Sequence, residues 1–148
     1  MELKKEVISI NPAFFRRYFF IFGRNEVFNG RKCWVLLFEP KRNFPEEKHV
    51  DRVLNNLAGE MWIAQTTFDL AKITFRLMRE VGFYLPSFAG ARVKKLEGYI
   101  IAGLLGGHMV VSSARVEYQY SARAFFWPEN GHAIKIIHYK NYERRNPR

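Results

Sequence analysis

The sequence has few of the features that would tie it to an oxidising compartment or to a membrane. Its 148 residues include one cysteine, Cys33, so no disulfide can form within the chain. A lone thiol is typical of a reducing compartment, and we expect a cytoplasmic protein. No apolar run approaches the roughly 18 residues of a membrane span, and no apolar segment follows the charged residues 1–6 as in a signal peptide. We therefore expect one soluble domain over residues 1–148, without membrane contact and with residues 140–148 as a loose basic tail.

Motifs that would identify an enzyme or a metal site are also missing. There is no phosphate-binding loop, nucleophile elbow or zinc-protease motif. Zinc-binding spacing is absent between Cys33 and the four histidines, which are His49, His108, His132 and His138. Acidic residues are few, whereas a metal-dependent nuclease needs clustered carboxylates. We expect no catalytic residues, no metal and no cofactor, and we keep a nuclease as an alternative.

What the sequence does have is positive charge, and it is unevenly distributed. The net charge is +10, which points to an anionic partner such as nucleic acid or an acidic protein. Residues 14–44 hold seven Lys or Arg against two acids, and residues 115–148 hold seven against three. The middle, residues 45–114, holds eight against seven. The two ends of the chain therefore carry almost all of the excess charge.

The first third of the chain is typical of a β-hairpin. Two aromatic and β-branched runs predict strands near residues 16–27 and 31–38, and Gly23 predicts a bulge in the first. Asn29 and Gly30 separate the runs and tolerate the positive φ angles of a tight hairpin turn. Within the runs, residues 19–22 and 36–38 are expected to be buried in the core.

Apolar residues in the middle third recur at helical spacing. They predict one helix from Glu46 to Trp62, a second from about Thr66 to Gly82, and a third from Ser87 toward Leu105. Glu46 and Glu47 lie in the expected first turn, where the helix dipole favours acidic side chains.

The last third is predicted to be β again. From residue 115 to 126 apolar residues alternate with polar ones, which indicates a strand with one face toward a core. Residues 128–131 are expected to form the turn before a returning strand. The predicted fold is therefore α+β, in the order β-β-α-α-α-β-β, with two antiparallel hairpins in one sheet of about four strands and three helices packed on one face.

Basic and aromatic residues interleave in the two β regions. Lys and Arg neutralise phosphates, and aromatic rings stack on unpaired bases. A duplex hides the faces of its bases, so this pattern favours single-stranded DNA first and RNA second, bound without catalysis and largely without sequence preference. The expected phosphate contacts are Arg16, Arg17, Arg24, Arg31, Lys32, Arg123 and Lys135. The expected stacking residues are Tyr18, Trp34, Tyr118, Tyr120 and Trp127.

Three segments extend this hypothesis to a family: RRYFFIFGRN, RKCWVLLF and RVEYQYSARAFFW. With the basic charge and a thermophile-like scarcity of Gln, Thr and Ser, the chain resembles the ThermoDBP group of archaeal single-stranded DNA-binding proteins. The resemblance concerns the organisation of most of the chain. It implies an apolar cleft between a sheet and helices that buries bases, with basic residues along its rim.

A second hypothesis explains the same composition by protein binding. The chain would then be a protein-interaction or oligomer-forming module, with an acidic protein or another copy as partner. Exposed aromatic rings would serve as anchors in the interface.

Overall fold

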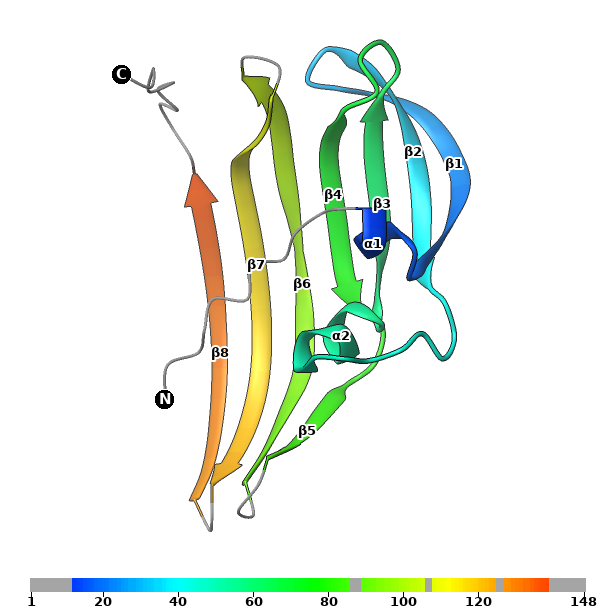
Figure 1. The fold of residues 1–148 in the computed structure, drawn as a ribbon. Helices are drawn as coiled ribbons and strands as arrows, with labels where there is room; N and C mark the ends of the chain where they lie inside the picture. Colours follow the sequence, from blue (N-terminus) through cyan, green and yellow to red (C-terminus); the bar gives the residue numbers. More distant parts are fainter. Residues whose placement is uncertain (1–11, 86–88, 106–107, 125–126, 139–148) are drawn as a thin grey trace, which may run out of the picture.

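The computed structural model describes residues 12–85, 89–105, 108–124 and 127–138, and most of them form one antiparallel sheet of eight strands (Figure 1). The elements, in chain order, are α1 (Pro12–Phe15), β1 (Tyr18–Phe28), β2 (Arg31–Pro40), α2 (His49–Leu54), β3 (Leu57–Ala64), β4 (Leu70–Leu77), β5 (Val81–Leu85), β6 (Ala89–Leu105), β7 (His108–Ala124) and β8 (Trp127–His138).

The sheet is a meander in which successive strands are neighbours. Its order is β1-β2-β3-β4-β6-β7-β8, and β5 pairs with β6 beside the end of β4. β6 is long enough for both partners, because residues 89–93 pair with β5 and residues 97–101 pair with β4. β1 and β8 are the two outer strands, at opposite ends of the sheet in Figure 1.

The predicted first hairpin and the alternation in the last third are confirmed. β1 and β2 pair around a turn in which Asn29 and Gly30 have φ angles of 49° and 75°. The pairing register shifts between Phe22 and Arg24, which places a bulge at Gly23. Of the alternating residues 115–126, residues 115–124 lie in β7, which is paired on both sides, and residues 125–126 lie outside the described residues. The turn expected at residues 128–131 is wrong, because these residues belong to β8 and pair with residues 120–123 of β7.

The predicted α+β fold with three helices is wrong. The expected helix at residues 46–62 is the short α2 followed by β3, the one at 66–82 includes β4, and the one at 87–105 is replaced by β6. β3 shows the reason, since five of its eight residues are buried and the other three are half-buried, as in a strand covered on both faces. A strand that is apolar on both faces lacks clear alternation, and periodicity alone does not separate it from a buried helix.

The sheet has two unlike faces, because residues paired across strands point to the same side. One, which we call the helix face, carries the row Leu36, Met61, Ile73 and Ile100. α1 and α2 lie in front of it in Figure 1. Its buried cluster is Tyr18, Phe38, Met61, Leu70 and Ile73, against which α1 packs Phe14 and Phe15.

The opposite face, which we call the charged face, carries most of the ionic side chains of the sheet. It includes Arg24, Glu60, Lys72, Arg76, Lys95, Glu97, Arg115 and Glu117. A smaller buried cluster, Cys33, Val35, Trp62 and Ala71, lies at the end of the sheet near the β1–β2 turn.

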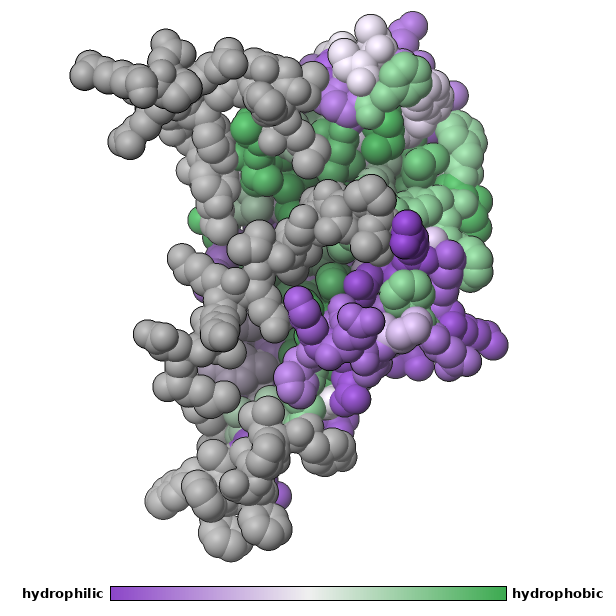
Figure 2. Space-filling view, viewed as in Figure 1, coloured by the Kyte–Doolittle hydropathy of each residue, from purple (hydrophilic) through white to green (hydrophobic). Residues whose placement is uncertain are grey.

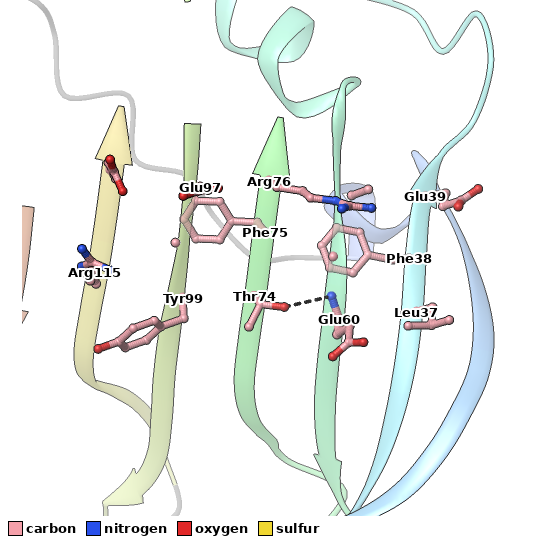
Figure 3. A pocket seen from close by; sticks show the side chains of 14 residues that line it. Leu37, Phe38, Glu39, Glu60, Thr74, Phe75, Arg76, Glu97, Tyr99 and Arg115 are labelled. Atoms are coloured by element: carbon pink, nitrogen blue, oxygen red, sulfur yellow. Dashed lines mark hydrogen bonds between the residues drawn. The ribbon is translucent and has the colours of Figure 1, made fainter. Parts of the chain in front are cut away.

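Two glycines let aromatic rings lie across the sheet. A Cβ at Gly59 would collide with the carbonyl oxygen of Thr74 and come within 3.0 Å of the Phe38 ring. At Gly98 it would collide with the carbonyl oxygen of Arg115 and come within 3.1 Å of the Phe75 ring. Figure 3 shows both rings, each reaching from its own strand toward the next. The row Phe38, Gly59, Phe75 and Gly98 therefore alternates ring and gap across four strands.

Candidate functional site

Three of the seven expected phosphate ligands are engaged in ion pairs within the fold. Arg17 lies 3.3 Å from Asp51 and also donates to Asn55, with only 11% of its side chain exposed. Arg24 donates to both Glu60 oxygens at 3.1 Å and to Glu26 at 2.8 Å. Arg31 pairs with Asp69 at 3.1 Å. These guanidinium groups join strands and loops that are distant in sequence. Their positive charges therefore have a structural role that does not require a bound phosphate.

The other four expected phosphate ligands are not brought together. Arg16 follows α1, Lys32 lies in β2, Arg123 in β7 and Lys135 in β8. Across the paired strands, Lys135 shares the helix face with Phe38, whereas Arg123 points to the side of Arg115. A single groove lined by all four is therefore not formed.

The five expected stacking residues are also dispersed. Tyr18 is 3% exposed and its hydroxyl donates to the carbonyl oxygen of Leu54 at 2.6 Å, so it belongs to the core. Burial raises the pKa of Tyr18 well above its ordinary value, against a smaller opposing effect of Arg17. Trp34 packs against Phe68, with ring centroids 5.7 Å apart. The side chain of Trp127 lies outside the described residues.

Tyr118 and Tyr120 form the one stacked pair of the expected set. Their centroids are 6.2 Å apart with an interplanar angle of 26°, and both are half-buried. The ring of Tyr120 lies over Gly131 of β8, where a Cβ would collide with it. Tyr118 faces Ala133, one diagonal step from Lys135. A pair of parallel rings beside a lysine is chemically suited to an aromatic ligand that carries negative charge.

The strongest surface feature is the apolar edge, which we define as residues Phe19, Phe20, Ile21 and Phe22 of β1. Phe19 and Ile21 are 60% and 61% exposed on one side of the strand, and Phe22 is 56% exposed on the other. Figure 2 shows this hydrophobic margin along the side of the molecule where β1 lies. Proteins seldom leave such a contiguous apolar edge in water unless it binds something.

The prediction that residues 19–22 and 36–38 are buried is wrong for all four side chains of this edge, and also for Leu37 of β2, since all five are exposed. An unbroken apolar run does indicate a strand covered on both sides. Here the strand is the outermost one of the sheet, so its partners on the far side are missing from the described chain. The run itself does not show that β1 is an outer strand. The absence of charge from residue 18 to 23 does show that, as an outer strand, it has no charged side chain to disfavour pairing with another strand.

The charged face holds a shallow pocket between β2 and β7 (Figure 3). Most of its acidic groups are paired: Glu60 with Arg24, and Glu117 with Lys95 at 3.2 Å and His132 at 3.0 Å. Hydrogen bonds from His132 and then Lys95 lower the pKa of Glu117. Arg76 and Arg115 line the pocket without an ion-pair partner among the described residues, but they rise from strands separated by β6.

Lys72 occupies an aromatic cage on the same face. Its Nζ lies 4.7 Å from the Trp62 ring centroid, 5.3 Å from that of Phe28 and 5.9 Å from that of Tyr99. Such contacts hold a cation over ring faces. The lysine fills the cage itself, so we interpret the group as structural. Cys33 beneath it is fully buried, and burial raises the pKa of its thiol, so it is not a reactive nucleophile.

Across the described ranges, no group of three or more His, Cys, Asp or Glu side chains is placed to hold a metal ion. No helix among these residues is long and apolar enough to cross a membrane. Family models, curated proteins and solved structures all yield no match to this chain.

Proposed function

We propose that this chain is a non-catalytic binding protein that acts by strand addition, in which a partner strand pairs with the apolar edge of β1. The observation that carries the proposal is the exposure of large apolar side chains on both sides of an outermost strand. Strand addition satisfies the free backbone groups of an outer strand and supplies side chains to both of its faces.

The position of the edge supports this function. β1 is held against β2 over ten residue pairs, so the outer side of the strand is a rigid template. The Phe20 ring packs near Phe15 of α1 and Phe38 of β2, with centroids 5.9 Å and 6.4 Å away. A partner would therefore meet a preorganised surface, which lowers the entropic cost of binding.

The chemistry of the edge also restricts the partner. Residues 18–23 carry no charge, and the nearby Arg24 is neutralised by Glu26 and Glu60. Lys41 lies beside the edge, with its Nζ 5.4 Å from the centroid of the Phe19 ring. The partner strand should therefore be apolar on both faces rather than acidic.

A cytoplasmic location is part of the same proposal.

Fluorescence anisotropy with a short labelled peptide of alternating Ile and Val, flanked by lysines for solubility, tests the proposal. We expect saturable binding to the native chain and loss of binding in Ile21→Lys. Met78→Lys is the matched control, because Met78 is 48% exposed but lies outside β1. N-methylation of alternate peptide nitrogens should abolish binding, since it removes backbone donors. Equal binding by native chain and Ile21→Lys would overturn strand addition.

Single-stranded nucleic acid binding, which the resemblance to the ThermoDBP group implies, is the second candidate. The stacked Tyr118 and Tyr120 rings beside Lys135 favour it. The cleft would then be the part of the helix face near β7 and β8, with base stacking on Tyr118 and phosphate contact at Lys135.

A tryptophan-fluorescence titration with a single strand of about 20 nucleotides and with its duplex tests this candidate. It predicts preferential single-strand binding. The logarithm of the binding constant should fall by about 0.7 per phosphate contact for each tenfold rise in salt concentration. Lys135→Ala should reduce both the affinity and the salt slope, whereas Lys48→Ala, an exposed lysine in the loop before α2, should change neither. Absence of binding at low salt would rule the candidate out.

A further inference from the structure

The two outer strands of the sheet differ in their protection against pairing. On β8, the exposed Ile134 and Ile136 flank Lys135, which points to the opposite face. A lysine in an outer strand disfavours the addition of another strand, because pairing would crowd and desolvate its charge. The apolar edge of β1 has no equivalent charge. Of the two outer strands, only β1 is therefore open to a partner.

We propose that the partner of β1 is β1 of a second copy of this chain, paired antiparallel about a two-fold axis that passes near Phe20 and Ile21. This inference rests on the strand-addition function proposed above. Among the described strands, β1 is the one with large apolar side chains strongly exposed on both faces, so it supplies the partner that it requires.

The side chains of β1 are chemically suited to this pairing. Opposite residues of antiparallel strands point to the same face. An axis at Phe20 would bring the two Phe20 rings together on the helix face and set Ile21 opposite Phe19 on the other face. An axis at Ile21 would instead set Phe20 opposite Phe22. Both registers bury apolar groups against apolar groups.

The resulting assembly closes on itself. A contact made by the same patch on both subunits stops at two copies, whereas pairing β1 with β8 would propagate head to tail. The dimer would be one continuous sheet whose strand order ends at each side with a copy of β8, protected by Lys135.

Electrostatics separates this dimer from binding to an anion. Each copy carries +10, so the two subunits repel at long range, and salt screens that repulsion. Dimerisation is therefore expected to strengthen as salt rises, whereas binding to nucleic acid or an acidic protein weakens.

Sedimentation velocity of the full chain over a range of concentrations tests the proposal. We expect a monomer–dimer equilibrium that shifts toward dimer with salt. Ile21→Lys should raise the dissociation constant by about tenfold or more, as for other central interface residues. Ile134→Lys is the control, because it makes the same substitution at an exposed isoleucine of β8. It should leave the dissociation constant unchanged. A native chain that stays monomeric at all concentrations and salts would overturn the second copy as partner.

The register can be tested by disulfide trapping in the full chain. Opposite Cα atoms in antiparallel strands lie about 4.5–5.5 Å apart, within the range of a disulfide. Phe20→Cys or Ile21→Cys should therefore form a covalent dimer on mild oxidation. Ile134→Cys is the control, and the native chain sets the background because its Cys33 is buried. Failure of both β1 variants to cross-link beyond the control would overturn the pairing.

The peptide experiment separates failure of this inference from failure of the function beneath it. A monomeric chain that still captures the Ile–Val peptide would retain strand addition and lose only the second copy as partner. A monomeric chain that does not bind the peptide would contradict both the strand-addition function and the second copy as partner.

Discussion

At the scale of single residues, the hydroxyl of Tyr18 connects β1 to α2. It donates to the carbonyl oxygen of Leu54 at 2.6 Å inside the core of the helix face. We expect Tyr18→Phe to lower the free energy of unfolding by about 1–2 kcal/mol, because a buried carbonyl loses its donor. Urea denaturation measures the change. Tyr99→Phe is the control, since no hydrogen bond of the Tyr99 hydroxyl occurs within the described residues, and an equal loss there would contradict the assignment.

The same hydroxyl should make stability depend on alkaline pH. Burial raises the pKa of Tyr18 in the folded chain, so unfolded Tyr18 releases its proton at about pH 10 while the folded state retains it. Stability from this group is present below pH 10 and is lost as the pH rises further. The difference in urea midpoint between the native chain and Tyr18→Phe should therefore shrink from pH 9 to pH 11. A constant difference would contradict the burial of this hydroxyl.

At the scale of strands, the alternation of ring and glycine across β2, β3, β4 and β6 should be sensitive to a single methyl group. Gly59→Ala places a Cβ against the carbonyl oxygen of Thr74 and the Phe38 ring. We expect a loss of about 1–3 kcal/mol or more, because the backbones of two strands must separate. Thermal unfolding measures the loss.

Gly103→Ala in β6 is the matched control for this substitution. Among the described residues, no atom lies within 4 Å of a Cβ built at Gly103. The change should be neutral or stabilising by at most about 1 kcal/mol, because alanine loses less backbone entropy on folding than glycine. Equal destabilisation by the two substitutions would mean that the close approach at Gly59 has no energetic role.

At the scale of the whole molecule, ion pairs between separate elements should make the fold sensitive to acid. Burial alone would raise the pKa of Asp51, but hydrogen bonds from the backbone of Lys48 and Glu47 and then from Arg17 hold it below its ordinary value. Asp69 is likewise lowered by Thr67 and Arg31 despite its burial. Their contribution is present above about pH 4, the unfolded value, and is lost as the pH falls through the lowered folded values.

We therefore expect the thermal midpoint to fall steeply below pH 4, where the positive charge of the molecule also rises. Asp51→Asn should destabilise the chain at pH 7, and the difference from the native chain should shrink as the pH falls through the lowered pKa of the Asp51 carboxylate. Glu39→Gln is the control, because Glu39 is exposed and has no ion pair among the residues described. Parallel curves for native chain and Asp51→Asn would contradict the role of the carboxylate.

The whole-molecule view also changes the meaning of the charge distribution. Charge was concentrated in the segments expected to be β, which favoured a basic strand surface over neutral helices. Since the middle third, which was predicted to be helical, consists mostly of strands of the same sheet, its acidic side chains reach the basic strands. Glu60 of β3 neutralises Arg24, and Asp69 before β4 neutralises Arg31. Together with Arg17, which pairs with Asp51, three of the basic side chains in these segments are therefore neutralised within the fold.

What the sequence by itself determined is local. Asn29 and Gly30 placed the first turn because their preference for positive φ acts within two residues, and the alternation that starts at residue 115 identified β7 because one of its faces stays polar. Residues 57–64 became a strand only through pairing with β2 and β4, since their apolar side chains suit either structure. The exposure of Phe19 and Ile21 was decided later still, by the position of β1 at the end of the strand order. Strand order is a long-range property, so no pattern within β1 could encode which of its sides would lack a neighbour.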